Sequence, residues 1–200
     1  MAPQLYLITP ANPDPASFPA VLMAVLNAAE VSALLVRRGS ADEAGYAKRA
    51  REIINVGQGA GCAVLLEDDA TLAKRLGADG VHINQGPEAV QDAIMALKPS
   101  FIVGAGTAAT RHDAMTMGEM EVDYVFFGPL EGASDPVASD LAEWWAATFE
   151  IPAVLSDPSA TPEQVDSRGA EFIALSTSIW SAAEPAKAMR AIADALRERA

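Results

Sequence analysis

Residues 63–83 read AVLLEDDATLAKRLGADGVHI, and the pattern within them recurs along the chain. An apolar run at residues 63–66 is followed by a segment with helical spacing at residues 69–76 and, after Gly77, by a second apolar run at residues 80–83. Short apolar runs are typical of strands buried on both faces, and glycine is common just after a helix. Because strand, helix and strand in this order form a unit with parallel strands, the stretch predicts a parallel sheet.

The same alternation accounts for the rest of the sequence. Eight apolar runs lie at residues 5–8, 33–36, 63–66, 80–83, 101–105, 124–127, 153–155 and 172–175. Eight helix-spaced segments lie at residues 18–29, 42–58, 69–76, 88–97, 112–117, 138–149, 162–167 and 185–198. Eight such units in 200 residues suit a small closed barrel, whereas a doubly wound sheet usually has about five to seven strands. The sequence therefore predicts an α/β fold, a (β/α)8 TIM barrel forming a single domain over residues 1–200.

Composition narrows the classes of function. The chain has 27 Asp and Glu against 14 Lys and Arg, a formal net charge of −13, which opposes binding to a phosphate backbone, so we expect no nucleic-acid partner. Apolar runs such as residues 124–127 are far shorter than the roughly 20 residues that cross a bilayer, so we expect no membrane partner. The N-terminal residues lack the pattern of an export signal, and the single Cys62 cannot form an internal disulfide. These features predict a cytoplasmic location.

In a TIM barrel the residues that follow the strands form the mouth, where ligands bind. Polar residues and glycines follow nearly every apolar run: Thr9, Arg37, Arg38, Glu67, Asp68, Asp69, Asn84, Gln85, Gly106, Thr107, Gly128, Pro129, Glu131, Ser156, Asp157, Ser176, Thr177 and Ser178. Strand ends face solvent in any barrel, so this pattern indicates a mouth without by itself indicating an enzyme.

Three consecutive carboxylates follow the third run. Glu67, Asp68 and Asp69 could hold Mg²⁺ through one or two oxygens, with phosphates of a substrate completing the coordination. The alternative is that Asp69 caps the following helix and the other two are solvated.

Two further groups suit a phosphate. Ser176, Thr177 and Ser178 supply hydroxyls and backbone N–H groups just before a helical turn, although a plain helix cap explains them nearly as well. Arg37 and Arg38 are the obvious cations of the mouth, and a guanidinium can grip phosphate oxygens at two points. Because strand side chains alternate, only one of the two arginines can point inward.

The remaining conspicuous side chains have structural interpretations. His82 lies within a strand, where a lone histidine is more often packed and hydrogen-bonded than a ligand contact. Trp144 and Trp145 are adjacent on a helix and cannot both face the core, so one is expected to pack and the other to mark a subunit contact, as in a homodimer.

Several segments, taken together, resemble one family. Residues 72–85, LAKRLGADGVHINQ, resemble the "ALA…GADGVHLGQ" segment of thiamine phosphate synthases. The order of other motifs also agrees: LYLIT at 5–9 with "YLVT", LLVR at 34–37 with "VQLR", LED at 66–68 with "IND", IVG at 102–104 with "IIG", DYVFFGP at 123–129 with "DYVGVGP" and STSI at 176–179 with "VSAI". The resemblance covers nearly the whole chain.

The resemblance implies a function and a set of site residues. Active members are TIM barrels that join a pyrimidine methyl diphosphate to a thiazole phosphate with Mg²⁺ and release diphosphate. The resemblance therefore implies that the chain, if active, is a transferase of thiamine biosynthesis that binds small phosphorylated metabolites. It implies catalytic roles for Arg37 and Asp68, and Mg²⁺ ligation by Asp68 and Glu88. Substrate binding would fall to Arg37, Glu67, Gln85, Gly106, Thr107, Gly128, Pro129, Ser176 and Thr177.

The sequence departs from the family pattern in several loops. Gly39 replaces a lysine, Glu67 an asparagine, residues 86–88 the second metal aspartate, residues 106–109 a serine and a histidine, residues 130–136 a "TxTK" loop and residues 156–159 a "GGI" turn. Carboxylates in place of lysine beside a diphosphate are unfavourable.

Three hypotheses follow. In the first, the chain is a thiamine phosphate synthase with a divergent mouth. In the second, it is a non-catalytic paralogue that keeps the barrel and binds a small phosphorylated or heterocyclic ligand or a protein partner. In the third, it catalyses a different reaction, with Glu67 or Asp68 as general base.

Overall fold

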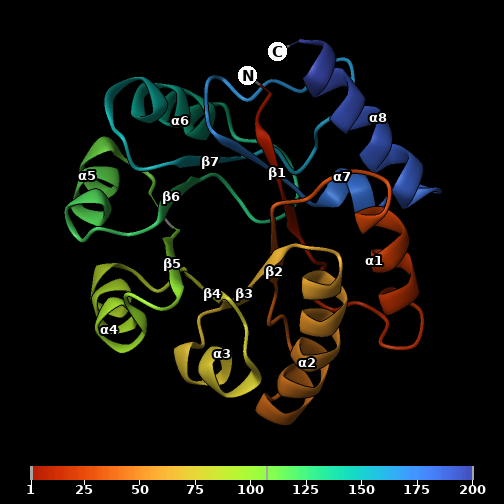
Figure 1. Cartoon of the computed structure of the whole chain (residues 1–200). Helices are drawn as coiled ribbons and strands as arrows, with labels where there is room; N and C mark the ends of the chain where they lie inside the picture. The colour runs from red at the N-terminus through yellow and green to blue at the C-terminus, as the bar shows by residue number, and fades with distance from the viewer. Residues whose placement is uncertain (1, 107, 200) are drawn as a thin grey trace.

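The computed structural model describes residues 2–106 and 108–199. Eight parallel strands form a closed barrel in which each strand pairs with the next along the chain, and the last pairs with the first (Figure 1). The strands are β1 (Gln4–Ile8), β2 (Ala33–Val36), β3 (Ala63–Glu67), β4 (Gly80–Ile83), β5 (Ile102–Ala105), β6 (Tyr124–Phe127), β7 (Ala153–Ser156) and β8 (Phe172–Leu175). The predicted TIM barrel is confirmed.

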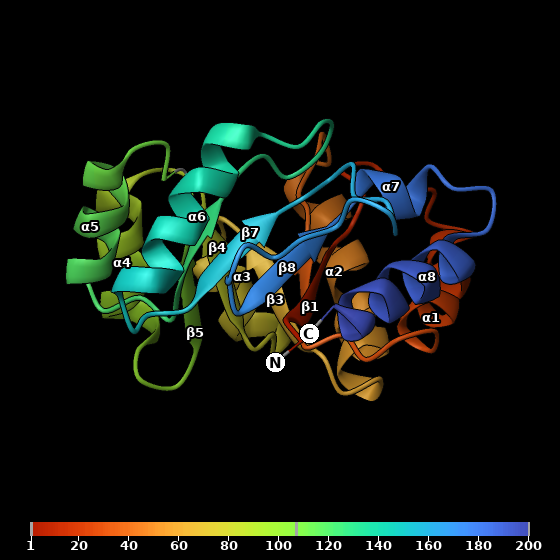
Figure 2. The ribbon, with the colours of Figure 1, turned by 90° about the horizontal axis from the view of Figure 1, so that it is seen from above.

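The helices surround the strands (Figure 1), and the view from above shows helices on both sides of them (Figure 2). They are α1 (Phe18–Leu26), α2 (Glu43–Gly59), α3 (Ala70–Leu76), α4 (Pro87–Leu97), α5 (Arg111–Glu119), α6 (Pro136–Thr148), α7 (Thr177–Trp180) and α8 (Pro185–Glu198). Side-chain caps set several of their starts: Asp42 accepts a hydrogen bond from the Gly45 N–H at 2.7 Å, and a capping box with Thr110 opens α5.

Strand alternation divides the apolar residues into two cores. Along β1, Leu5 and Leu7 pack outward among the helices, while Tyr6 and Ile8 point into the barrel. The inner core consists of Tyr6, Ile8, Leu35, Leu65, Tyr124, Phe126, Val154 and Ala174. The barrel interior is thus a packed core, and ligand chemistry is left to the strand ends.

One predicted helix is absent. Residues 157–171, all of which the structure describes, form turns and bends where the sequence predicts a helix at residues 162–167. The Arg199 guanidinium donates hydrogen bonds to the carbonyls of Pro162 and Glu163 at 2.6 and 2.9 Å. A segment this short gains few helical hydrogen bonds, so a side chain from the end of the molecule binds its carbonyls instead.

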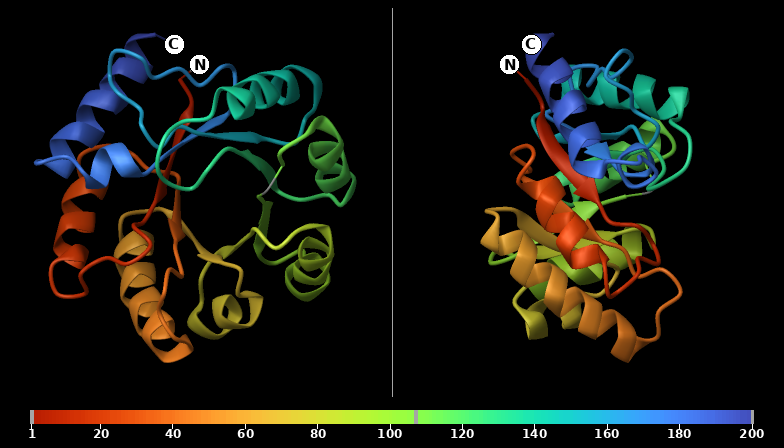
Figure 3. Two further views of the ribbon diagram at one scale, coloured as in Figure 1. Left: turned by 180° about the vertical axis from the view of Figure 1, so that it is seen from behind. Right: turned by 90° about the vertical axis from the view of Figure 1, so that its right-hand side faces the viewer.

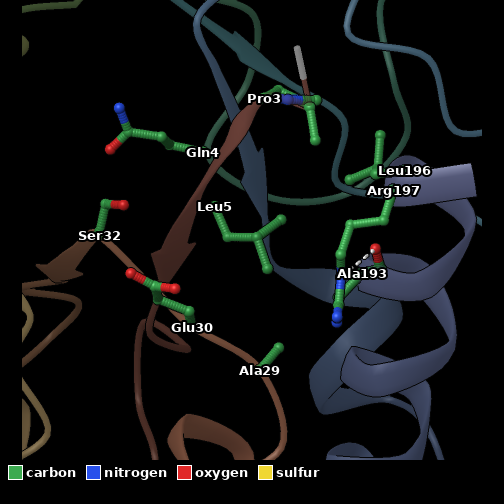
Figure 4. A pocket seen from close by; sticks show the side chains of 10 residues that line it. Pro3, Gln4, Leu5, Ala29, Glu30, Ser32, Ala193, Leu196 and Arg197 are labelled. Carbon is green, nitrogen blue, oxygen red and sulfur yellow. Dashed lines mark hydrogen bonds between the residues drawn. The ribbon is translucent and has the colours of Figure 1, made fainter. Parts of the chain in front are cut away.

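The start of β1 and the end of α8 lie side by side at the amino-terminal ends of the strands (Figure 3). There the start of β1 and the end of α8 enclose a cavity of about 320 Å³, lined by Gln4, Leu5, Leu196 and Arg197 among others (Figure 4). In the part of the chain that the structure describes, no helix combines the length and apolar character needed to cross a membrane.

Candidate functional site

Arg37 is the arginine held inside the mouth. It follows β2, and its side chain is 14% exposed, against 41% for Arg38. Its Nε donates to Glu67 Oε2 at the end of β3, at 3.1 Å, and its backbone N–H donates to Thr9 Oγ1 after β1 at 2.9 Å. Arg38 turns outward, 3.8 Å from Asp69. Thr9 thus fixes the backbone of Arg37, and Glu67 fixes its guanidinium.

A second carboxylate faces the same guanidinium. Arg37 Nη1 lies 3.5 Å from Glu131 Oε2, an ion pair, yet Nη1 is buried and makes no hydrogen bond within the described residues. Glu131 is 60% exposed, so water and salt weaken this pair. Arg37 therefore carries an N–H group that is desolvated and free to bind an anion, provided the anion displaces Glu131.

Residues 130–135, here called the strap, close over the mouth. Leu130 packs against the inner core of the barrel. The Gly132 N–H donates to Thr177 Oγ1 at 2.8 Å, and Ser134 bonds to both Asp157 and Ser159. In Figure 1 the segment between β6 and α6 reaches across toward β1 and α7. The strap therefore joins the ends of β6, β7 and β8.

Asp68 is held in a conformation that few non-glycine residues adopt. Its φ is 53°, in the left-handed region. Its backbone N–H donates to the His82 carbonyl at 3.0 Å, and its Oδ1 accepts from the Asn84 N–H at 2.7 Å. Burial raises the pKa of Asp68, an effect that the nearby Glu67 carboxylate reinforces and the Asn84 N–H opposes. Such strained residues are concentrated at functional sites.

His82 is fully buried within β4 and hydrogen-bonded at both ring nitrogens. Nδ1 lies 2.8 Å from the Tyr124 hydroxyl, and Nε2 lies 3.1 Å from Asn84 Oδ1. Burial lowers the pKa of His82 to about 4, so the imidazole is neutral at physiological pH. The prediction of a packed, hydrogen-bonded histidine is confirmed.

The turn after β8 carries hydroxyls without protein partners. Ser176 is 3% exposed, and neither its Oγ nor that of Ser178 has a hydrogen-bond partner among the described residues. Ser176 precedes α7 but makes no side-chain cap hydrogen bond, so the plain-cap interpretation does not account for its hydroxyl. Because β8 and β2 both flank β1, this turn and Arg37 lie on one side of the mouth.

The three acidic residues after β3 separate into different roles. Asp69 Oδ1 accepts from the Leu72 N–H at 2.8 Å and caps α3, so the first part of the alternative interpretation is confirmed. Its second part, that Glu67 and Asp68 are solvated, is wrong, because both carboxylates accept hydrogen bonds from the protein. Both Glu67 oxygens take part in hydrogen bonds: Oε2 with Arg37 and the Arg38 N–H, Oε1 with Asn84 Nδ2 at 3.4 Å. Over residues 2–106 and 108–199, no three His, Cys, Asp or Glu side chains gather so as to hold a metal ion.

Other residues of the predicted site occupy varied places. Gln85 and Glu88 are exposed, the first between β4 and α4 and the second on the first turn of α4. Gly128 follows β6 with φ 105°, and the Pro129 carbonyl accepts from Ser156 Oγ at 2.6 Å. Thr107 lies outside the described residues.

Asn84 is among the residues that the sequence places at the mouth, but the sequence assigned it no role in the site. Its side chain lies between His82 and Glu67, and its backbone binds Asp68. The available signal was that Asn84 stands where the resembled segment "GADGVHLGQ" has glycine. Gly106 leaves room for it, since a Cβ there would lie 2.1 Å from Asn84 Oδ1.

Of the two adjacent tryptophans, one packs in the core, as expected, and the other is partly exposed. Trp145 is buried and stacks on Phe149, with ring centroids 4.1 Å apart. Trp144 is half-buried beneath the Arg111 guanidinium, which lies 4.6 Å from its ring centroid. The homodimer remains a prediction.

Comparisons with known proteins agree on one family. The sequence profile for thiamine monophosphate synthase matches residues 5–179. A thiamine-phosphate synthase of Hyphomonas neptunium is 34% identical over 203 residues, covering 94% of this chain and 91% of the relative. One from Rhodospirillum centenum is 31% identical over 198 residues, covering 96% and 95%. A solved thiamine phosphate pyrophosphorylase from Pyrococcus furiosus has a TM-score of 0.81 at 19% identity, covering 98% of this chain and 96% of that one, and shows the same fold.

Proposed function

Since the chain belongs to the thiamine monophosphate synthase family, a family of thiamine biosynthesis, we propose that it joins a pyrimidine methyl diphosphate to a thiazole phosphate. The observation that carries the proposal is the Arg37 guanidinium, fixed by Glu67 and presenting a buried Nη1 without a hydrogen bond. An arginine placed in this way binds a diphosphate oxygen with little loss of side-chain entropy.

In this proposal the charge of Arg37 acts on the leaving group. As the bond between the pyrimidine methyl carbon and the diphosphate oxygen breaks, negative charge gathers on the diphosphate, and a fixed cation in a water-poor mouth stabilises that charge. In the same proposal the hydroxyls of Ser176 and Ser178 donate hydrogen bonds to the phosphate of the thiazole, supported by their lack of a hydrogen-bond partner among the described residues. Glu131 must leave Arg37 before the diphosphate binds, since both are anions.

The family uses Mg²⁺, but the described side chains do not fit a preformed Mg²⁺ site. Asp68 was predicted to ligate the ion with Glu88, yet one Asp68 oxygen already accepts from Asn84 and Glu88 is exposed on α4. No cluster of three candidate ligands forms among the residues that the structure describes. We therefore expect Mg²⁺ alone to bind weakly, which a calorimetric titration with the ion measures.

The proposal is tested by turnover of the purified protein with both substrates, with and without Mg²⁺. Wild type is expected to release diphosphate and form thiamine phosphate, and Arg37→Gln is expected to lower kcat/KM by about 100-fold or more. Arg51→Gln, on the exposed face of α2, is the matched control. A well-folded wild-type protein that forms no product contradicts the proposal.

A second candidate is a non-catalytic paralogue that binds a small phosphorylated or heterocyclic ligand. It is favoured by the closed mouth, where Leu130 packs on the inner core and two carboxylates flank Arg37. This candidate predicts calorimetric binding of the thiazole phosphate without turnover when the pyrimidine diphosphate is added. Turnover would exclude it.

We further propose the cellular setting that the sequence predicts. Small phosphorylated metabolites are the partners, neither nucleic acid nor membrane is involved, the location is cytoplasmic, and two copies pair through the helix that carries Trp144.

A further inference from the structure

A chain of polar side chains runs from the interior of the barrel to its mouth. The hydroxyls of Tyr6 and Tyr124 lie 3.0 Å apart, and the Tyr124 hydroxyl lies 2.8 Å from His82 Nδ1. His82 Nε2 lies 3.1 Å from Asn84 Oδ1, and Asn84 Nδ2 lies 3.4 Å from Glu67 Oε1. Its members come from β1, β6, β4 and β3 and from the residue just after β4.

The chemistry of the groups sets the direction of every hydrogen bond. The Asn84 amide must present its Nδ2 to the Glu67 carboxylate, because a carboxylate only accepts. Its Oδ1 then faces His82, so the hydrogen of the neutral imidazole lies on Nε2. Nδ1 is left as an acceptor for the Tyr124 hydroxyl, which in turn accepts from Tyr6. All donors therefore point toward the mouth.

Two glycines make room for this chain. A Cβ at Gly104 would lie 1.9 Å from Tyr124 Cζ, and a Cβ at Gly106 would lie 2.1 Å from Asn84 Oδ1 and 2.9 Å from His82 Nε2. Both glycines lie at the end of β5, beside β4 and β6. Their lack of a side chain is what lets the Tyr124 ring and the Asn84 amide occupy this space.

We propose that Asn84 is a positioning residue. Its amide Nδ2 donates to Glu67 and so holds the carboxylate that fixes the Arg37 guanidinium in the mouth, while its Oδ1 accepts from His82 Nε2 and sets the tautomer of the imidazole. Glu67 Oε1 is held by Asn84, and its Oε2 is held by Arg37 Nε and the Arg38 N–H. Losing the first of these bonds leaves the carboxylate free to rotate, and Arg37 loses a fixed partner. Only the final readout below rests on the proposed function.

The tautomer of His82 is the first readout, measured by ¹⁵N NMR. His112→Gln, which removes the second of the two histidines from an exposed position, leaves a single imidazole spectrum. We expect the hydrogen on Nε2 from about pH 6 to 8 in wild type. In Asn84→Ala the Nε2 hydrogen loses its acceptor, so a population with the hydrogen on Nδ1 should emerge. A wild-type ring with its hydrogen on Nδ1 overturns the proposal without any variant.

Hydrogen exchange at the Arg37 Nε–H is the second readout. We expect Asn84→Ala to speed this exchange by about tenfold, the effect of losing one hydrogen bond to a charged group. Asn84→Asp separates the two links, because it still accepts from His82 Nε2 but cannot donate to Glu67. Its tautomer should stay that of wild type while Arg37 exchange rises. The matched control is Asn55→Ala, on the exposed face of α2. Unchanged Arg37 exchange in both Asn84 variants overturns the proposal.

Inorganic pyrophosphate is the probe for the final readout. Asn84→Ala is expected to weaken its calorimetric affinity by about tenfold, but to have no further effect in an Arg37→Gln background. Equal effects of Asn84→Ala in the two backgrounds would show a role apart from Arg37 and overturn the proposal. If wild type binds no pyrophosphate, the proposed function fails, while the tautomer and exchange readouts still decide the role of Asn84.

Discussion

Two carboxylates contact the Arg37 guanidinium in different ways: one fixes its orientation, and the other occupies the position where an anion would bind. Glu67 fixes its Nε at 3.1 Å, while Glu131 lies 3.5 Å from its Nη1. The first carboxylate is as buried as the arginine and belongs to a strand end. The second is largely exposed and belongs to the strap. We interpret Glu67 as a permanent partner and Glu131 as one that an anionic ligand replaces.

This interpretation predicts that removing the negative charge of Glu131 raises the affinity for an anionic ligand. Glu131→Gln should raise the affinity for inorganic pyrophosphate by about threefold to tenfold at low ionic strength, because a competing anion is lost. The gain should shrink as salt is added. Glu119→Gln, which removes the same charge at the exposed end of α5, serves as the control in calorimetric titrations. Equal or weaker binding by Glu131→Gln would count against the competition.

Packing against the Tyr124 ring requires glycine at position 104. Because a Cβ at Gly104 would lie 1.9 Å from the Tyr124 ring, Gly104→Ala should lower the free energy of unfolding by about 1–3 kcal/mol. Gly59→Ala, at the end of α2 with no atom within 4 Å of the added Cβ, should instead be neutral or stabilise by up to about 1 kcal/mol. Urea unfolding measures both. A Gly104→Ala protein as stable as wild type would refute the requirement.

Among the elements, the strap is the segment that decides access to the mouth. It forms neither helix nor strand. Hydrogen bonds to neighbouring strand ends, such as the one from the Gly132 N–H to Thr177 Oγ1, hold it in place. Gly132 has φ 93°, which a residue with a side chain adopts at a cost, so the turn that aims its N–H at Thr177 depends on glycine.

Removing the acceptor should loosen the strap. Thr177→Val deletes the hydroxyl that binds the Gly132 N–H, so amide hydrogen exchange at Gly132 should quicken by about tenfold. Thr71→Val, on the exposed face of α3, makes the same chemical change without touching the strap. Unaltered exchange at Gly132 would mean that other contacts hold the strap closed.

The whole molecule couples stability to pH through His82. Its pKa is about 4 in the folded chain against 6.5 for an unburied histidine, so between these pH values the unfolded chain binds more protons. As far as His82 is concerned, the free energy of unfolding should therefore be highest above pH 6.5 and fall by roughly 3 kcal/mol as the pH is lowered to 4. The raised pKa of Asp68 acts in the opposite direction, so the contribution of His82 is read as a difference between proteins.

The measurement is urea unfolding across this pH range in wild type and His82→Gln. The variant lacks the titrating group, so its stability should depend less steeply on pH, whatever its absolute stability. His112→Gln, at an exposed position, is the control. Parallel pH profiles for wild type and His82→Gln would refute the linkage.

Local pattern was sufficient for most of the architecture. The apolar runs and helical spacings lie within short windows, so β4 and α8 were predicted at the bounds that the structure has, and the order of the units implied the barrel. The family followed from motifs of similar length, such as residues 72–85. The helix expected at residues 162–167 was wrong, because Arg199 from the chain's end binds those carbonyls.

The site depended on contacts between distant segments. Alternation showed that only one of Arg37 and Arg38 could face inward, but the Glu67 and Glu131 partners that identify it come from other loops. Tyr6 and Tyr124 are 118 residues apart and meet only because the barrel closes. Periodicity records which face of a strand a residue occupies, whereas the partner across the barrel depends on register, tilt and side-chain packing, and these are set only when all eight strands are assembled.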